Sequence, residues 1–369
     1  MRGTDAATVR RALGSGDPLP GATGFAGRLD GRLVRDVLGR RPVFGTPDDW
    51  GFVPTDIDTD DPTPVPAGHV RDSTADGPVD RRVWSLPDPP ATTDAAAAIG
   101  TVERAATEAV AAVNDDGNDL AVAFSGGVDS ALVASGVPDA PCYVAGFPDA
   151  GDVATARDAA AAMDRDLRVV ELNHADLERA VPEVVAATGR TDAMSVSIAL
   201  PLYVVAERAA VDGFDRLALG QGADELFGGY AKVVDPADDD RIDATTVRGA
   251  VRETIHTLPD GIERDTLTLR AAGVEPVFPL LDDRVVRAAL PLPDHLLATD
   301  DRRKIALRRA VAGRLPSTVV DADKKAVQYG SLVSRELDRL ARQAGFKRRL
   351  DRHVDRYIES LVDDRRSRT

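Results

Sequence analysis

The chain has 369 residues, a formal net charge of −15 at pH 7 and a pI near 4.8. This length predicts one large domain or two ordinary domains with a full hydrophobic core. The acidic balance argues against a general nucleic-acid binder, which needs a basic face. A single cysteine, Cys142, excludes an intrachain disulfide and a thiolate metal cluster, and the five histidines have no ligand-like spacing.

The N-terminal and apolar segments predict no membrane association. Met-Arg-Gly-Thr-Asp at the start lacks the apolar core of a signal peptide. The longest apolar stretch, residues 193–206, contains Ser195, Ser197 and Pro201 and is too short to span a bilayer. We therefore expect a soluble, cytoplasmic protein.

Lysine is rare in this chain. Five of the 46 basic residues are lysine, namely Lys232, Lys304, Lys324, Lys325 and Lys347. An acidic, lysine-poor surface leads to the hypothesis that the protein works in high salt.

Residues 1–90 are rich in glycine, proline and aspartate. Short β-like pieces occur at 24–29, 32–36 and 50–53, and 56–66 resembles a polar loop. The composition changes near residue 90, where we place a domain boundary. The segment 91–114 follows as a predicted core-packing helix, with one apolar face that consists of Ile99, Val102, Ala106, Val110 and Val113.

Strand and helix patterns alternate in the next part of the chain. The predicted strands are 120–124, 142–147, 167–172 and 216–219, and the predicted helices are 152–164, 176–188 and 197–212. This order predicts an α/β fold with a parallel sheet covered by helices on both faces. Ligands of such sheets bind at the carboxyl ends of the strands. Two glycine-rich loops leave such ends, at Ser125 and Gly220.

The part of the chain after Gly229 has a mostly helical pattern with acidic loops. From Leu332 onward, arginines alternate with acidic residues around spaced apolar positions, which predicts surface helix. We assign 346–369 to a helical or disordered tail, and expect disorder from Arg365 to Thr369.

The first glycine-rich loop has the composition of a pyrophosphate site. It reads Ser-Gly-Gly-Val-Asp-Ser between an apolar strand and a helix, with Ser125, Gly126, Gly127, Asp129 and Ser130 as candidate ligand residues. Glycines let the backbone approach an anion, and a helix N-terminus favours negative charge. A carboxylate at Asp129 fits only if a cation lies between it and phosphate, which indicates Mg²⁺. Ser-Gly-Gly alone is equally typical of a plain turn, and the sequence is not a Walker A loop.

The second loop, residues 220–230, contains four glycines and two adjacent acids. We expect Asp224 to lie opposite Asp129 and to share a Mg²⁺ that bridges the ATP phosphates. The alternative is a glycine-rich turn with solvated acids.

Two later segments carry further candidates. Asp282 follows an apolar run and is expected to be partly buried, or alternatively to cap the next helix. Three of the five lysines lie between Lys304 and Lys325, and lysine suits negative charge developing on phosphate. The alternative is that these are ordinary surface lysines.

These motifs together resemble one known family. The segments 125–130, 220–230, 275–282, 304–308 and 324–330, in this order, resemble the synthetase domain of the asparagine synthetase family. That domain is an ATP pyrophosphatase of the PP-loop type, with an adenine nucleotide α-hydrolase-like fold. The resemblance assigns 91–345 to this domain. Residues 20–90 look like the later part of the family's class II glutaminase domain, so 1–90 is interpreted as a truncated glutaminase-like region.

The resemblance implies a reaction. The family activates the β-carboxylate of aspartate with Mg-ATP, giving an acyl-adenylate and pyrophosphate, and an amine then displaces AMP. By position, the first loop and Asp129 would hold pyrophosphate and metal, with Asp224 sharing the metal. The further implied roles are a nucleotide pocket at Ala145 and Gly220, substrate binding by Glu225 and Asp282, and charge stabilisation by Lys304 and Lys325.

Three positions depart from the family pattern. Arg2 stands where the glutaminase has its nucleophilic cysteine, and Cys142 falls in a predicted buried strand, so we expect no glutamine hydrolysis by this chain. Nitrogen would come from ammonia, a separate glutaminase or another amine. Gln221 replaces a glutamate that could accept a proton, and Val277 replaces an arginine.

The sequence therefore predicts an ATP-dependent, AMP-forming amide ligase without its own glutaminase, with aspartate as the first substrate to test. Gln221 and Val277 favour a related amide- or lactam-forming ligase with a different carboxylate and amine. A non-catalytic nucleotide-binding subunit is the third alternative, and the retained acidic residues and lysines argue against it. The predicted partners are small molecules, ATP and Mg²⁺, not nucleic acid or membrane.

Overall fold

A computed structural model describes residues 1–58, 62–113, 119–148, 150–322, 331–349 and 351–367. The N-terminal region contains an antiparallel sheet of order β1-β2-β5-β6 and a short β3–β4 pair. These strands are β1 (Ala26–Leu29), β2 (Arg32–Arg35), β3 (Phe44–Gly45), β4 (Trp50–Gly51), β5 (His69–Thr74) and β6 (Gly77–Arg82). A small β-rich N-terminal region was predicted and is confirmed, and the structure shows that its strands are antiparallel.

One helix of this region was not predicted. Helix α1 (Ala6–Ser15) begins where Asp5 accepts a hydrogen bond from the Thr8 N–H, and ends at Gly16 in the left-handed conformation. Its Val9 packs with Phe25 and Trp84 in a small separate core. Helix α1 has only two buried residues. The apolar periodicity of its sequence is therefore too weak to distinguish a helix from a loop.

The central sheet has five parallel strands in the order β11-β10-β7-β8-β9. They are β7 (Leu120–Ala123), β8 (Cys142–Gly146), β9 (Leu167–Glu171), β10 (Arg216–Ala218) and β11 (Glu275–Val277). Four of them were predicted, whereas the edge strand β11 was not. Because β7 and β10 are neighbours, the two glycine-rich loops leave adjacent strand ends.

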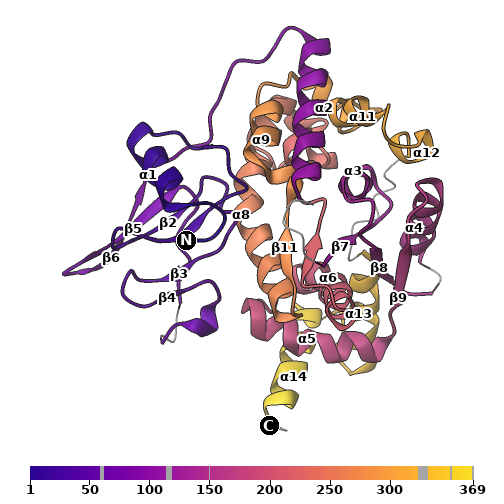
Figure 1. Cartoon of the computed structure of the whole chain (residues 1–369). Coiled ribbons are helices and arrows are strands. Elements are labelled where there is room, and N and C mark those ends of the chain that lie inside the picture. The colour runs from indigo at the N-terminus through magenta and orange to yellow at the C-terminus, as the bar shows by residue number, and fades with distance from the viewer. Residues whose placement is uncertain (59–61, 114–118, 149, 323–330, 350, 368–369) are drawn as a thin grey trace.

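Helices cover both faces of this sheet, which confirms the predicted α/β class. Residues of β7 alternate between two cores: Val122 contributes to one and Ala121 to the other. The first core includes α2 (Ala95–Ala111), α3 (Val128–Gly136), α4 (Gly151–Ala162), α8 (Val247–Ala271), α9 (Asp283–Ala289) and α11 (Ile305–Val311). The second includes α5 (His174–Thr188), α6 (Ala193–Val211), α13 (Ser331–Gln343) and α14 (His353–Arg366), in the lower part of Figure 1. Three short helices complete the domain, α7 (Ala223–Phe227), α10 (Asp294–Leu297) and α12 (Ser317–Val320).

Helix α6 starts earlier than predicted because Asp192 caps it, accepting from the Ser195 N–H. Its 19 residues give it the length and apolar composition of a membrane span, which the shorter predicted stretch lacked. Within the fold, 61% of that apolar window is buried. The composition is therefore explained by packing in the second core.

The C-terminal helix α14 is packed against the domain. Tyr357 and Ile358 are buried in the second core, and Arg365 forms a 2.6 Å ion pair with Glu183. The expected disorder from Arg365 is thus wrong at Arg365 and Arg366, which belong to the helix, while 368–369 lie outside the described residues.

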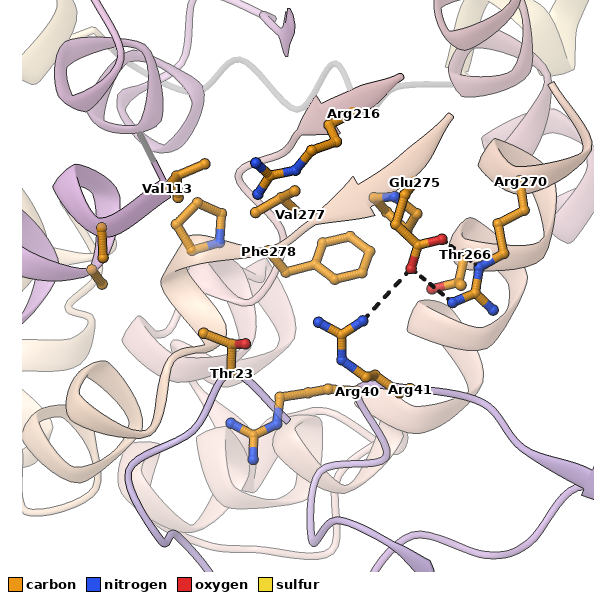
Figure 2. Close-up of a pocket in the computed structure, with 14 residues that line it drawn as sticks. Thr23, Arg40, Arg41, Val113, Arg216, Thr266, Arg270, Glu275, Val277 and Phe278 are labelled. Carbon is orange, nitrogen blue, oxygen red and sulfur yellow. Dashed lines mark hydrogen bonds and ion pairs between the residues drawn. The ribbon is translucent and has the colours of Figure 1, made fainter. Parts of the chain in front are cut away.

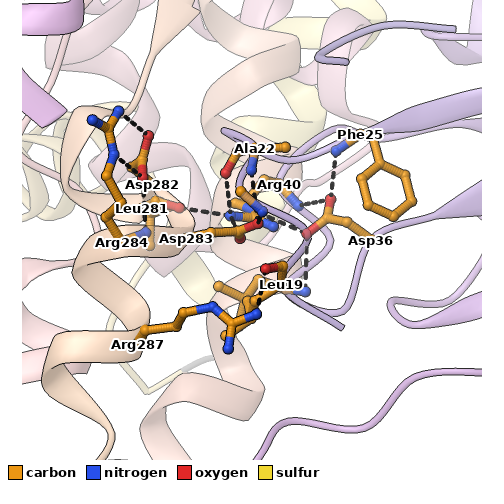
Figure 3. Close-up of polar contacts among 12 residues, drawn as sticks. Leu19, Ala22, Phe25, Asp36, Arg40, Leu281, Asp282, Asp283, Arg284 and Arg287 are labelled. Atoms are coloured by element: carbon orange, nitrogen blue, oxygen red, sulfur yellow. Dashed lines mark hydrogen bonds and ion pairs between the residues drawn. The ribbon is translucent and has the colours of Figure 1, made fainter. Parts of the chain in front are cut away.

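A buried ionic network joins the N-terminal region to the central domain (Figure 3). The Arg40 guanidinium bonds to Asp36 at 2.8 Å and to Asp283 at 2.7 Å. Asp283 also accepts from the backbone N–H groups of Gly21 and Ala22. All three charged side chains are at most 2% exposed, so each depends on the others for partners.

Candidate active site

The first loop is shaped by a glycine and a serine. Gly126 has φ +77°, and a Cβ there would lie 2.7 Å from the Thr155 carbonyl oxygen, so only glycine fits. The Ser130 hydroxyl donates to the Gly127 carbonyl at 3.2 Å and accepts from the Ser125 N–H at 3.2 Å. Gly127 then caps α3 without a side chain. The N–H groups at this helix start are therefore arranged as an anion site requires.

The second loop packs directly against the first. A Cβ at Gly220 would lie 2.9 Å from the Asp129 Cβ and 3.1 Å from the Ser130 nitrogen. Gly222 has φ +91°, and a Cβ there would meet Leu281 at 2.3 Å. Gly220 therefore allows the loops after β7 and β10 to touch, which brings predicted residues of both loops together, while Gly222 leaves room for Leu281.

Lys304 joins the two loops. Its side chain is 2% exposed, and its Nζ donates to Asp129 Oδ2 and lies 2.5 Å from Asp224 Oδ1. Lys304 itself lies just before α11 and has a φ of +57°. This backbone conformation is uncommon for a residue other than glycine. The structure thus places three sequence-predicted residues, from three separate segments, at one point.

The electrostatics keep this lysine charged. Burial alone lowers the pKa of Lys304, but the charges of Asp129 and Asp224 outweigh it and raise the pKa above 10.5. Gly229 provides the space, since a Cβ there would lie 1.8 Å from Asp224 Oδ1 and 2.4 Å from Lys304 Cε. Gly229, the last glycine of the second loop, therefore leaves room for the contact between Lys304 and Asp224.

The two carboxylates have the character of a partial Mg²⁺ site. Asp129 Oδ1 is buried without a hydrogen-bond partner, and one Nζ reaches oxygens of both aspartates. Among the described residues no group of three or more His, Cys, Asp or Glu is placed to hold a metal. Mg²⁺ is commonly bound by one or two carboxylates and completed by phosphate oxygens. Asp129 and Asp224 are compatible with a Mg²⁺ that is bound together with ATP, and their role as metal ligands stays a prediction.

Glu225 follows Asp224 on α7 and is held by Tyr230, whose hydroxyl donates to Glu225 Oε1 at 2.5 Å. Burial raises the pKa of Glu225, and the neighbouring Asp224 charge raises it further. A carboxylate at this position, next to Asp224, can accept a hydrogen bond from an ammonium group.

The remaining sequence candidates are placed less decisively. Asp282 is the N-cap of α9, accepting from the Arg284 backbone N–H at 2.8 Å and from its Nε at 2.9 Å (Figure 3). This is the capping arrangement named as the alternative, and its substrate role stays a prediction. Ala145 is buried at the carboxyl end of β8, next to β7. Lys325 lies outside the described residues.

Asp265 contacts the second loop, and the sequence did not indicate it. It is 3% exposed on α8, accepts from Gln221 Nε2 at 3.1 Å, and is paired with Arg264. A glutamate at position 221 would place two carboxylates in contact, whereas an amide donates a hydrogen bond. Asp265 is therefore a suitable hydrogen-bond partner for Gln221, which stands where the family has a glutamate. Asp265 lacks a motif and is separated from Gln221 by 44 residues, so no local pattern could identify it.

Residues 101–244 and 238–367 match the asparagine synthase family. The chain belongs to this family. The match includes both loops and Lys304. The family consists of ATP-dependent ligases that form C–N bonds.

Two relatives are named as asparagine synthetases. The chain is 27% identical over 246 residues to a putative glutamine-hydrolysing asparagine synthetase of Methanocaldococcus jannaschii, covering 58% of this chain and 45% of the relative. It is 25% identical over 193 residues to a probable glutamine-hydrolysing asparagine synthetase of Dictyostelium discoideum, covering 49% of this chain and 34% of the relative. The matched segments thus span less than half of these relatives.

Proposed function

We propose that this protein is an ATP-dependent, AMP-forming amide ligase that activates a carboxylate, first of all aspartate, as an acyl-adenylate for attack by an amine. The convergence of Asp129, Asp224 and Lys304 beside the first loop carries this proposal. Adenylation separates pyrophosphate from AMP, and needs cations at the phosphates and donors for the leaving pyrophosphate. We also propose a cytoplasmic location, because the proposed reaction uses ATP.

Each residue has a distinct task in this proposal. The backbone N–H groups at the start of α3 and the Ser125 hydroxyl bind the pyrophosphate oxygens. Asp129 and Asp224 would hold Mg²⁺, which would neutralise phosphate charge. Lys304, which remains protonated, then has its ammonium available for negative charge developing on the α-phosphate. Placement and charge stabilisation, rather than covalent help, accelerate such transfers.

The carboxylate substrate is bound through Glu225 in this proposal. Its partner Tyr230 fixes one carboxylate oxygen, which orients the group toward an ammonium on the substrate. The Gln221–Asp265 bond and the absence of a charge at Val277 favour a second candidate, a related amide- or lactam-forming ligase with another carboxylate and amine.

We propose that nitrogen does not come from glutamine hydrolysis by this chain. Cys142, the single cysteine, is fully buried in β8, and burial raises the pKa of its thiol. A buried thiol of raised pKa is a poor nucleophile. Free ammonia, a separate glutaminase or another amine would supply nitrogen. A glutaminase assay on purified protein should remain at background, and measurable glutamate release would refute this part of the proposal.

The deciding experiment measures pyrophosphate release from ATP in molar salt, with Mg²⁺, ammonia and a panel of carboxylates. Release with aspartate is expected, and release only with another acid would select the second candidate. No release with any carboxylate across salt concentrations would instead indicate a non-catalytic subunit. Lys347→Ala, at an exposed lysine, is the matched control for Lys304→Ala.

A further inference from the structure

The Lys304 ammonium lies between the carboxylates of Asp129 and Asp224. Its Nζ donates to Asp129 Oδ2 and lies 2.5 Å from Asp224 Oδ1. The Lys304 side chain is 2% exposed, whereas the two aspartate side chains are 20% and 24% exposed. The ammonium is therefore shielded from solvent, while each aspartate side chain keeps part of its surface exposed.

This position of the ammonium opposes the binding of a second cation to the same oxygens. A metal ion that binds Asp129 Oδ2 and Asp224 Oδ1 would contact the same two atoms as the Lys304 Nζ. Like charges at such short range repel each other strongly in a partly buried site. A divalent ion and the ammonium therefore compete for these two oxygens.

The charge of Lys304 also reaches a third carboxylate. Burial and the Asp224 charge raise the pKa of Glu225, and the Lys304 charge opposes this rise. Lys304 thus offsets negative charge from Asp129, Asp224 and Glu225 together. When its ammonium moves away, that negative charge becomes available to another cation.

The backbone around Lys304 is held by hydrogen bonds. The Lys304 carbonyl accepts from the Arg308 N–H at 2.9 Å, and Arg303 Nη1 donates to the Gly229 carbonyl at 2.9 Å. The lysine side chain has a flexible stem of four carbons. Asp129 lies in the first turn of α3, the helix start that we propose to bind pyrophosphate. Rotation of the side chain alone can therefore move the ammonium from Asp129 toward phosphate at this loop.

We propose that Lys304 is a built-in counter-cation that competes with Mg²⁺ for Asp129 and Asp224 and so makes metal binding depend on nucleotide. The inference rests on the proposed binding of Mg-ATP and adds a regulation of that site. The metal alone has to displace the ammonium, so it binds weakly. ATP phosphates supply further metal ligands and also new acceptors for the Lys304 ammonium. Lys304 then contacts phosphate only after the metal has taken its place at the aspartates.

The first test measures Mg²⁺ binding to the full chain by calorimetry, without ATP. Lys304→Met keeps the length of the side chain but removes its charge. We expect Mg²⁺ affinity to be about tenfold higher or more in this variant, since an adjacent unit charge changes a binding constant by at least that factor. Lys347→Met, at an exposed lysine, is the control and should bind Mg²⁺ as wild type does. If Lys304→Met does not fold, the uncharged Lys304→Gln replaces it.

A double variant shows where the metal binds. Lys304→Met combined with Asp129→Asn removes one carboxylate from the pair, so the gain in Mg²⁺ affinity should disappear. A melting curve provides a second measurement, because a ligand of the folded state raises the melting temperature. Mg²⁺ should raise the melting temperature of Lys304→Met more than that of wild type or of the double variant.

The second test follows the ammonium itself by NMR in the wild-type protein. The chain has five lysines, so labelling lysine with ¹⁵N gives few side-chain signals, and the Lys304 variant identifies the Lys304 signal by its loss. Mg²⁺ alone at millimolar concentration should leave this signal unchanged. Mg²⁺ together with α,β-methylene-ATP, which resists cleavage between the α- and β-phosphates, should shift it as the ammonium leaves Asp129 and Asp224.

Three outcomes would overturn the proposal. They are equal Mg²⁺ affinity of wild type and Lys304→Met, a gain in affinity that persists in the double variant, and an unchanged Lys304 signal when Mg²⁺ and the nucleotide analogue are bound. Failure of the proposed ligase function appears separately, as no binding of the analogue or no pyrophosphate release. In that case the comparison of Mg²⁺ affinities without nucleotide still decides whether Lys304 competes with the metal.

Discussion

The Lys304 ammonium contacts two carboxylates, and its positive charge offsets the repulsion between them in a confined site. Removing the ammonium in Lys304→Ala leaves Asp129 and Asp224 without their shared counter-charge. We therefore expect loss of pyrophosphate release together with a lower melting temperature. Asp129→Asn should abolish release as well, since it weakens both the Mg²⁺ site and the Lys304 contact. Near-normal turnover in either variant, with Lys347→Ala as the control, would refute the assignment.

Gly229 is the second residue whose replacement has a defined consequence. A methyl group there overlaps Asp224 Oδ1 and Lys304 Cε, so Gly229→Ala must displace both side chains. We expect activity to fall at least tenfold. The control is Gly261→Ala on α8, where a Cβ meets nothing within 4 Å and the change should be neutral or stabilising by up to about 1 kcal/mol. Equal activity of the two variants would contradict the steric role of Gly229.

Glu225 predicts a pH dependence. Burial and the Asp224 charge raise its pKa above 4.5, so the folded protein keeps this proton to a higher pH than the unfolded chain. At pH values above the folded pKa, ionised Glu225 therefore lowers the free energy of unfolding. This loss disappears at pH values below the unfolded pKa. Glu225→Gln should melt at a higher temperature than wild type at pH 7 but not at pH 4. If Glu225 binds substrate as a carboxylate, the same variant should lose the acid limb of the kcat/KM profile. Unchanged melting at pH 7 would argue against the raised pKa.

At the scale of elements, the Arg40 network fixes the start of α9 to the N-terminal region. Arg40→Ala would leave Asp36 and Asp283 buried without their common partner, although backbone N–H groups still reach Asp283. Breaking a buried pair typically costs about 3–5 kcal/mol. Urea unfolding measures this loss. The control is Arg10→Ala, whose exposed ion pair with Asp30 should cost under about 1 kcal/mol. Equal losses in the two variants would show that the network is not needed.

The elements also show what sequence patterns can and cannot predict. The strands β7, β8 and β10 were predictable because each is a short apolar run, as a strand buried on both faces requires. The edge strand β11 has three residues with Pro276 at its centre, and this composition is typical of a loop. In the site, the two loops were predictable because their chemistry is local in sequence. Asp265 depends on a contact between distant segments, which no local pattern contains.

At the scale of the whole molecule, a net charge of −15 should make stability depend on salt. Self-repulsion of the acidic surface is screened by counter-ions, so the melting temperature should rise from low salt to molar KCl. A non-ionic osmolyte at the same osmolality is the control, and should stabilise less. A melting temperature that does not rise with KCl would remove the high-salt hypothesis.

The 25-residue helix α8 carries two neighbouring residues, Asp265 and Thr266, that lie at different places in the molecule. Asp265 holds Gln221 of the second loop, and Thr266 lines a cavity beside β11 (Figure 2). One peptide unit therefore connects the residue that holds the second loop with a residue of that cavity wall. A displacement of the helix backbone at Thr266 would also displace Asp265 and its hydrogen bond to Gln221.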